Sequence, residues 1–137
     1  IRIIGDYDID GVTATYILLK GFKRLGANVD TYIPDRVADG YGIHDHLIKK
    51  AMEDGIDTIV TCDNGISASS QITYAKELGM TVVVTDHHEV PFTDTEEGRT
   101  YILPPADAII NPKQADCTYP NKNICGAVVA MKLVFAL

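Results

Sequence analysis

The chain has 137 residues, 46% of them hydrophobic and 23% charged, which is the size and composition of one globular domain. Its formal net charge of −7 argues against a broad basic face for duplex DNA, although acids around bound divalent cations would also make this count negative. No apolar run is long enough to span a bilayer, and the first residues resemble no signal peptide, so we expect no membrane partner.

Short β-branched runs alternate with segments of helical period along the chain. In chain order, this pattern predicts a strand over 1–5, a helix over 11–25, a strand over 29–33, a helix over 43–52, a strand over 58–62, a helix over 67–78, strands over 81–85 and 108–110, and a helix over 125–137. The segment 93–99 has neither period, and we expect a mobile surface loop there. The alternation predicts an α/β fold with an open, mostly parallel sheet and helices on both faces.

The three cysteines form no short paired spacing. They are Cys62, Cys117 and Cys125. An odd count without a Cys-x-x-Cys pair argues against a disulfide framework and against a zinc site. We therefore expect a reducing, cytoplasmic location. Cys62 ends a strand-like run and is interpreted as a packed core thiol.

Acidic and histidine side chains follow three of the predicted strands, at the point where each strand ends. They are Asp6, Asp8 and Asp10 after the first strand, Asp63 after 58–62, and Asp86, His87 and His88 after 81–85. Because the carboxyl ends of parallel strands lie at one edge of an open sheet, we expect these side chains to meet in one crevice.

Carboxylates that meet in a crevice repel one another unless cations lie between them. Hard oxygen ligands joined by one or two imidazoles suit Mn²⁺ or Mg²⁺, and the histidines favour Mn²⁺. The ligands are numerous enough for two ions. Ion pairs roughly 3.5–4 Å apart are the usual device for hydrolysing phosphate esters, so the pattern predicts a two-metal phosphoesterase.

Each of these turns also has a simpler interpretation. The spacing Asp-x-Asp-x-Asp-Gly could open a calcium-binding EF-hand loop, but its twelfth position is Ile17 and a strand precedes it, so we rank this below the hydrolase. Alone, Asp63-Asn64-Gly65 is better interpreted as a turn that caps a helix, and Asp86 as the cap of a strand end. Only the joint occurrence of all three turns favours a metal centre.

The same residues resemble the motifs of the DHH phosphoesterase family. Asp6-Tyr7-Asp8-Ile9-Asp10-Gly11 resembles its motif I, Asp63-Asn64-Gly65 resembles its motif III, and Asp86-His87-His88 is the triplet that names the family. Arg36 with Gly40-Tyr41-Gly42, and the stretch from Asn111-Pro112 to Leu133, resemble the RecJ-type members. In this order and spacing the similarity covers nearly the whole chain. The resemblance implies a DHH phosphoesterase-like, Rossmann-like three-layer fold.

The resemblance also implies a role for each acidic or histidine side chain. Asp8 would bind the first ion with Asp6 beside it, Asp10 and His87 would bind the second, and Asp63 would bridge both. The two ions would be Mn²⁺ or Mg²⁺. His88 would contact the scissile phosphate and stabilise its developing charge. Asp86 would orient its neighbours without binding an ion.

Five further residues are implied to bind substrate, and each has a structural alternative. Arg36 would bind a phosphate with its planar fork, or else pair with Asp35 or Asp39 at the surface. Gly40, Tyr41 and Gly42 would form a tight loop in which Tyr41 stacks on a base, or else a turn with a packed Tyr. Gly126 would leave free N–H groups for a phosphate at a helix start, or else allow close packing of that helix.

The sequence departs from the family pattern at two points. The family usually carries Ala where Ile9 stands, and we expect the larger side chain to point into the core with little effect. The family also supplies a further metal-binding Asp, and a DHHA1-type substrate-binding domain, from later segments. We therefore interpret residues 1–137 as a truncated DHH catalytic domain that binds the second ion poorly and has little or no activity alone.

Within this resemblance, the leading hypothesis is a 5′-to-3′ exonuclease on single-stranded DNA, active in DNA repair and recombination. The alternatives are another DHH hydrolase, acting on cyclic dinucleotides, short oligonucleotides or pyrophosphate, and a non-catalytic DHH scaffold. The stretches 36–42 and 111–133 favour the exonuclease. The scaffold is disfavoured because Asp8, Asp10, Asp63 and His87 are all present. The partners expected are single-stranded DNA and unspecified DNA-repair proteins.

Overall fold

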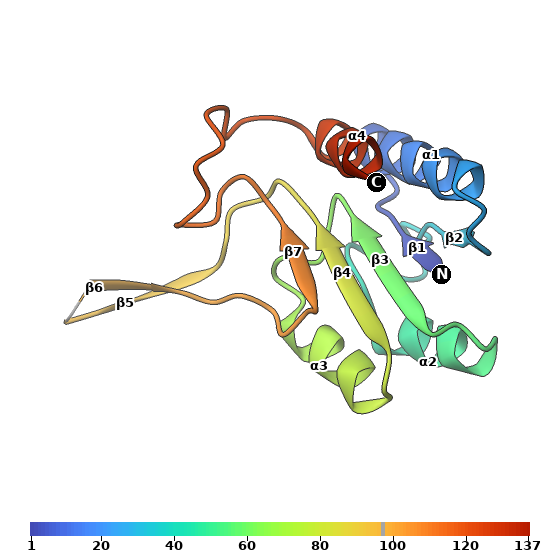
Figure 1. The fold of residues 1–137 in the computed structure, drawn as a ribbon. Coiled ribbons are helices and arrows are strands. Elements are labelled where there is room, and N and C mark those ends of the chain that lie inside the picture. The colour runs from blue at the N-terminus through green and yellow to red at the C-terminus, as the bar shows by residue number, and fades with distance from the viewer. Residues whose placement is uncertain (97) are drawn as a thin grey trace.

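The computed structural model describes residues 1–96 and 98–137. In chain order the elements are β1 (Arg2–Ile4), α1 (Ile9–Arg24), β2 (Asp30–Tyr32), α2 (Asp45–Glu53), β3 (Thr58–Cys62), α3 (Ser69–Glu77), β4 (Thr81–Thr85), β5 (Phe92–Thr95), β6 (Gly98–Tyr101), β7 (Ala108–Ile110) and α4 (Gly126–Ala136). Five strands form one sheet in the order β2-β1-β3-β4-β7, and β5 and β6 form a separate hairpin (Figure 1).

Every strand pair in the five-stranded sheet is parallel. The β3–β4 pair is the longest, running in register from Thr58 opposite Thr81 to Cys62 opposite Thr85. Parallel strands are connected by crossover helices that cover the sheet on its faces. The predicted open parallel sheet is therefore confirmed, and all five strands end at one edge.

Helices cover both faces of the sheet, which gives three layers (Figure 1). Helices α1 and α4 pack on one face, where Ile3 and Val60 point toward Leu18. Helices α2 and α3 pack on the other face, which contains Ile4 and Ile59. Successive strand residues thus serve opposite layers, as the two-residue period of a strand requires. No helix in the described residues is long and apolar enough to cross a membrane.

Helix α1 begins at the edge of the sheet where the strands end. Asp8 is its N-cap, and its Oδ1 accepts a hydrogen bond of 2.9 Å from the Gly11 N–H. A Cβ at Gly11 would lie 2.5 Å from the Asp6 carbonyl oxygen, so only glycine lets the first turn approach the end of β1 this closely. The Asp-x-Asp-x-Asp-Gly spacing therefore places its acids around a single tight strand-to-helix turn.

Strands β3, β4 and β7 have the bounds predicted from sequence, and the other elements predicted there differ by one or two residues at their ends. The surface loop expected over 93–99 is wrong. Phe92–Thr95 and Gly98–Tyr101 form an antiparallel hairpin, although residue 97 lies outside the described residues. The Arg99 Nε donates to Asp94 Oδ1 at 3.1 Å across the hairpin. Such cross-strand pairing joins residues five positions apart and produces no strand or helical period of apolar residues in the sequence.

The expectation that Ile9 points into the core is also wrong. Its side chain is 83% exposed on the outer surface of α1. Ile9 is the first residue of the helix, one position after the N-cap. The buried side of α1 contains Ala14 and Leu18 instead. The larger side chain of Ile9 therefore extends into solvent and needs no space in the core.

The packing of α1 on the sheet is testable with two leucines of the same helical region. Leu18 is fully buried and Leu25 is 58% exposed. We expect Leu18→Ala to lower the free energy of unfolding by about 2–5 kcal/mol, because it leaves a cavity. Leu25→Ala should change it by no more than about 0.5 kcal/mol. Urea denaturation followed by circular dichroism measures both, and equal effects would contradict the packing of α1.

Candidate metal centre

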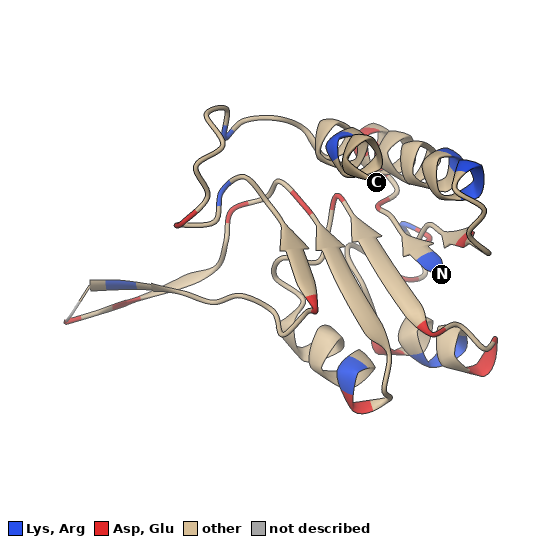
Figure 2. Cartoon of the chain, viewed as in Figure 1, with Lys and Arg blue, Asp and Glu red and all other residues tan. Residues whose placement is uncertain are grey.

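The turns that follow β1, β3 and β4 meet at the carboxyl edge of the sheet. Figure 2 shows acidic residues in the loops directly beyond the strand arrowheads and at the adjoining start of α1. Two groups of potential metal ligands have donor atoms within 4.8 Å of one another: Asp6, Asp8 and Asp63 form one, and Asp63, His87 and His88 form the other. The predicted convergence is therefore observed, and Asp63 belongs to both groups.

Asp63 has an unusual backbone and environment. Its φ of 60° is the only positive φ of a non-glycine residue in the described chain, and such strain is found mainly where function demands it. Its side chain is only 2% exposed. No described residue donates a hydrogen bond to its buried Oδ1. A buried carboxylate oxygen without a donor needs another positive partner.

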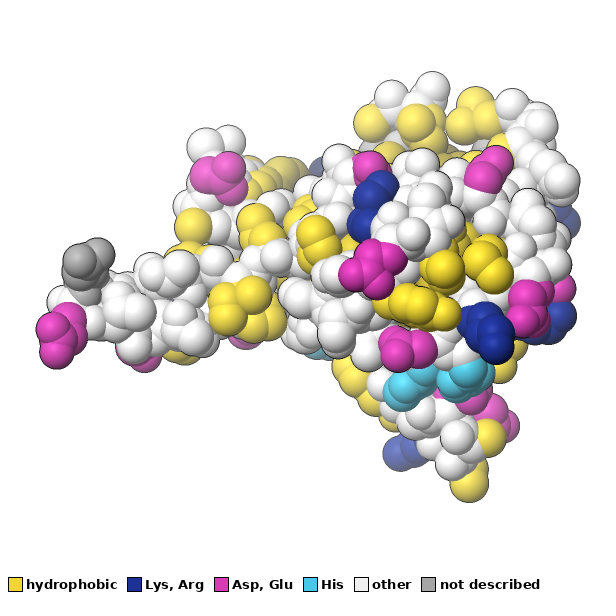
Figure 3. All heavy atoms as spheres, turned by 90° about the horizontal axis from the view of Figure 1, so that it is seen from below, with side chains coloured by type: hydrophobic (Ala, Val, Ile, Leu, Met, Phe, Trp, Pro, Cys, Tyr) yellow, Lys and Arg dark blue, Asp and Glu magenta, His cyan; other side chains and the backbone are white. Residues whose placement is uncertain are grey.

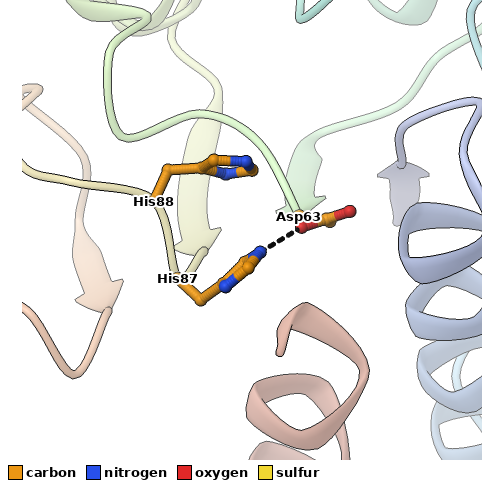
Figure 4. Close-up of side chains that lie close together, drawn as sticks. All are labelled: Asp63, His87 and His88. Carbon is orange, nitrogen blue, oxygen red and sulfur yellow. Dashed lines mark ion pairs between the residues drawn. The ribbon is translucent and has the colours of Figure 1, made fainter. Parts of the chain in front are cut away.

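His87 approaches this same oxygen. Its Nε2 lies 2.9 Å from Asp63 Oδ1, the contact drawn as a dashed line in Figure 4. The proximity is close, but its direction is not that of a hydrogen bond, since Oδ1 stays without a hydrogen-bond partner. Two lone-pair donors that face one another in this way match two ligands of a single cation. The residues present therefore fit a metal ion beside Asp63 and His87.

Burial and like charge act together on Asp63. Burial, followed by repulsion from Asp10 and Asp8, raises the pKa of Asp63 to about 8. Burial also raises the pKa of Asp6, whose Oδ1 accepts one hydrogen bond of 2.8 Å from the Tyr7 N–H. Both shifts favour the protonated carboxyl when no cation is present, and a cation beside Asp63 would displace its proton.

Asp86 organises the histidines and has no place in either ligand group. Its Oδ1 accepts hydrogen bonds from the backbone N–H groups of His87 and His88 and from His88 Nδ1 at 2.7 Å, while its Oδ2 accepts from the Ile66 N–H. Burial opposes ionisation of Asp86, but these donors outweigh it and lower its pKa. The hydrogen bond to Asp86 in turn raises the pKa of His88. This geometry matches the orienting role expected of Asp86.

Gly126 does not offer its N–H group to a phosphate. The N–H groups of Gly126 and Ala127 donate to the Asp10 carboxylate at 2.7 and 2.8 Å. A Cβ at Gly126 would also lie 2.7 Å from Asp63 Oδ1. In this structure an acid of the same molecule takes the N–H groups that the expected phosphate would need, so the phosphate role of Gly126 stays a prediction. The alternative of close packing holds, with Asp63 as the neighbour.

Asp10 is held by α4 at the border of the second ligand group. Its Oδ2 lies 3.5 Å from His87 Nε2. A carboxylate oxygen has lone pairs for both an N–H group and an ion, so the hydrogen bonds to α4 are compatible with the expected metal contact. His88, and not Asp10, completes the compact group with Asp63 and His87.

The loop that contains Arg36 and Tyr41 borders the centre. The Arg36 guanidinium lies 5.4 Å from the ring centroid of Tyr7, and neither Asp35 nor Asp39 forms an ion pair with it in the described residues. The Tyr41 ring meets the His88 ring edge-on, with centroids 6.1 Å apart. Gly40 and Gly42 on either side of Tyr41 both have positive φ, as a tight loop requires. The expected tight loop is thus present, and Tyr41 places it beside His88.

Sequence reasoning missed two residues that shape this region. Asp39 anchors the loop, since its carboxylate accepts from the Asp35 N–H at 2.8 Å and lies 2.9 Å from His46 Nε2. Asn64 is 1% exposed, with an Oδ1 that lacks a partner. Asn64 was visible as the middle residue of Asp-Asn-Gly, but the contacts of Asp39 join separate segments and had no sequence signal.

The raised pKa of Asp63 has a consequence for stability. In the metal-free protein Asp63 keeps its proton up to pH about 8, whereas the unfolded chain releases it near 3.8. Between these values the folded state binds more protons, so the free energy of unfolding should fall as pH rises. The raised pKa values of Asp6 and His88 act in the same direction.

We therefore expect the melting temperature of the metal-free protein to fall between pH about 5 and about 8, and Mn²⁺ to reverse the loss. Asp63→Asn should weaken both the pH dependence and the effect of Mn²⁺. Thermal denaturation in chelated and Mn²⁺-containing buffers measures this. A metal-free melting temperature that rises across this range would mean that Asp63 is already ionised.

The contact between α4 and Asp63 can be tested through metal affinity. Gly126→Ala should displace the Asp63 carboxylate, because the added Cβ would lie 2.7 Å from its Oδ1, and should weaken Mn²⁺ binding by about 10-fold or more. Ala127→Gly keeps the N–H group that donates to Asp10 and adds no atom, so it should bind Mn²⁺ as the unchanged protein does. Calorimetry compares the Mn²⁺ affinities of the two variants. Equal affinities would mean that Asp63 does not contribute to Mn²⁺ binding.

The chain is similar over its whole length to proteins of known family. The DHH family, N-terminal domain, matches residues 1–136. The single-stranded-DNA-specific exonuclease RecJ of Bacillus subtilis (strain 168) is 46% identical over 137 residues, which is 100% of this chain and 16% of that protein. The RecJ of Escherichia coli (strain K12) is 42% identical over 138 residues, or 100% of this chain and 22% of that protein.

Solved structures give the same result. A crystal structure of exonuclease RecJ bound to manganese has a TM-score of 0.83 and 35% identity, covering 99% of this chain and 32% of that chain. RecJ in complex with Mn²⁺ from Thermus thermophilus has a TM-score of 0.73 and 32% identity, covering 99% and 17%. The chain spans 16% and 22% of the two relatives above. With its motifs, three-layer fold and strand-end acids in agreement, the chain belongs to the DHH family.

Proposed function

We propose that this protein is a metal-dependent phosphodiesterase that acts as an exonuclease on single-stranded DNA. The observation that supports it most is the position of Asp63, which groups with Asp6 and Asp8 on one side and has its Oδ1 2.9 Å from His87 Nε2 on the other. One carboxylate between two sets of ligands is the arrangement that a two-metal phosphoesterase needs. The relatives named single-stranded-DNA-specific exonucleases, 36–46% identical to this chain, indicate the substrate. The 5′-to-3′ polarity rests on the family resemblance.

We assign the metal-binding roles to Asp6, Asp8, Asp10, Asp63 and His87, with Asp63 as the shared ligand. Mn²⁺ is the ion expected, since oxygen ligands with imidazole suit it and two similar solved structures are of RecJ with manganese. When bound, a pair of such ions would supply positive charge and Lewis acidity at the scissile phosphate. Mg²⁺ is the alternative ion.

His88 and Asp86 are given roles other than metal binding in this proposal. The contacts of Asp86 fix the His88 ring and favour its protonated form. We propose that His88 donates a hydrogen bond to a phosphate oxygen and stabilises the charge that develops there. Arg36 lies on the neighbouring loop and would bind a further phosphate with its planar fork.

The proposal concerns the whole protein, because the residues described here correspond to a fraction of its relatives. We further propose that the protein acts in DNA repair and recombination in the cytoplasm. Cys62, Cys117 and Cys125 are all free, which supports a reducing compartment. Cys62 is buried beside Thr15 Oγ1 at 3.3 Å, and burial raises its pKa to about 12, as a packed core thiol requires.

The shared role of Asp63 can be tested in the full-length protein. Asp63→Asn should lower Mn²⁺-dependent hydrolysis of single-stranded DNA by at least about 100-fold, more than the loss of an outer-shell partner. Glu53→Gln changes an exposed acid at the C-terminal end of α2, away from the strand ends, and should leave the rate unchanged. Release of nucleotides from end-labelled oligonucleotides measures both, and labels at either end give the polarity.

Two results would contradict the proposal. Activity that survives thorough chelation, or survives Asp63→Asn, would exclude the shared-ligand mechanism. Cleavage of pyrophosphate or a cyclic dinucleotide much faster than single-stranded DNA would assign the protein to another branch of DHH hydrolases.

A further inference from the structure

Buried polar atoms without partners mark a second site beside the metal centre. Three such side-chain atoms occur in the described residues: Asp63 Oδ1, His44 Nε2 and Asn64 Oδ1. The first belongs to the metal centre. The other two belong to residues that line one pocket of about 280 Å³. Leaving a buried polar atom unpaired costs free energy, so each such atom in a folded protein calls for an explanation.

The pocket lies between two turns that lead into helices on the same face of the sheet. Gly42 to His44 form one wall and precede α2, and Asn64 to Ala68 form the other and precede α3. His88 and Asp86 also line it, which places it directly beside the metal centre. The N-cap residues of α2 and α3, His44 and Ala68, make no side-chain capping bond, so acceptors on a ligand can meet helix N–H groups here.

Asn64 requires a donor from the occupant. Its Nδ2 donates to the carbonyl oxygens of Ile4 at 3.3 Å and Cys62 at 3.2 Å, which fixes the orientation of the amide and leaves Oδ1 as a free acceptor. Asn64 is only 1% exposed, so this atom is not hydrated from bulk solvent. The occupant that matches it has an N–H or O–H group.

The other residues that line the pocket restrict which polar ligands fit it. Gln71 adds a side-chain amide, and Tyr41, which is 55% exposed, adds an aromatic ring. None of the lining residues is Lys or Arg, and Asp86 contributes a carboxylate, so the pocket is unsuited to a phosphate group. A planar ligand with both donors and acceptors on its edge and an aromatic face fits this set. Nucleobases have these properties.

We propose that this pocket holds the nucleobase of a nucleotide flanking the scissile phosphate, with Asn64 Oδ1 accepting a hydrogen bond from the base edge. This inference rests on the proposed function, because it needs the phosphate of the same strand at the metal centre. The phosphate would lie with His88 and the ions, and the base would enter the adjoining pocket, which His88 also lines. All four DNA bases have an N–H donor, so the pocket accepts any of them.

The test fills the pocket without touching the metal ligands. In the full-length protein, Ala68→Leu places a larger side chain in the pocket, and Gln71→Ala removes the amide as a second variant. Glu77→Ala, an exposed change on the same helix outside the pocket, is the control. Each variant is assayed on single-stranded DNA and on two strands with an abasic residue on one or the other side of the first scissile phosphate.

We expect Ala68→Leu to lower kcat/KM on normal DNA by about 10-fold or more, the scale of one base contact, with Mn²⁺ affinity unchanged. One of the abasic strands should be a poor substrate for the unchanged protein, and Ala68→Leu should remove this difference. Gln71→Ala should show a smaller effect in the same direction, and Glu77→Ala none. Unchanged kcat/KM and unchanged discrimination in both pocket variants would overturn the proposal and leave ordered water as the partner of Asn64.

A binding measurement separates this inference from the proposed function. Calorimetry with deoxycytidine monophosphate and with inorganic phosphate, both in the presence of Mg²⁺, needs no turnover. Loss of nucleotide binding in Ala68→Leu with retained phosphate binding supports the base pocket even if DNA is not hydrolysed. Equal loss of both ligands, or loss of neither, overturns it.

Discussion

The repulsion between carboxylates gathered at the ends of parallel strands is the constraint on which the rest of this structure depends. The acids after β1, β3 and β4 cannot all be ionised and buried together without positive partners. The fold supplies such partners from its own backbone for most of them. Asp8 accepts from the first turn of α1, Asp10 from the first turn of α4, and Asp86 from the Ile66 N–H. Helix N-termini and turns therefore hold the outer acids in place.

Asp63 is the acid for which the described backbone supplies no donor. Its left-handed backbone directs the carboxylate toward His87, and Gly126 brings α4 so close that no further atom fits. Burial at this position, together with repulsion from Asp10 and Asp8, raises the pKa of Asp63. A site that is strained and short of positive charge in the metal-free state is organised to gain stability from a cation. The same α4 turn that packs against Asp63 also holds Asp10, so one close contact between helix and strand end fixes both carboxylates.

Two neighbouring residues thus have buried oxygen atoms in different surroundings. Asp63 Oδ1 lies among the potential metal ligands, whereas Asn64, the next residue, lines a pocket without Lys or Arg and has an unpartnered Oδ1. Charge within the described surface is mixed: Figure 3 shows Lys and Arg next to Asp and Glu on the face seen from below. With a net charge of −7, the proposed binding of a nucleic acid strand would depend on bound ions and on local contacts more than on a basic face.

The sequence by itself determined the sheet, its covering helices and the acids at the strand ends, because two-residue and helical periods, glycines and β-branched runs are local signals. Strands β3, β4 and β7 were predicted to the residue for this reason. Only the tertiary structure decided which groups satisfy which acids. The capture of Asp10 by Gly126 joins residues 116 positions apart, the β5–β6 hairpin depends on pairing across a turn, and the exposure of Ile9 depends on which side of α1 meets the sheet. Contacts of this kind follow from packing in three dimensions, and no periodicity along the chain encodes them.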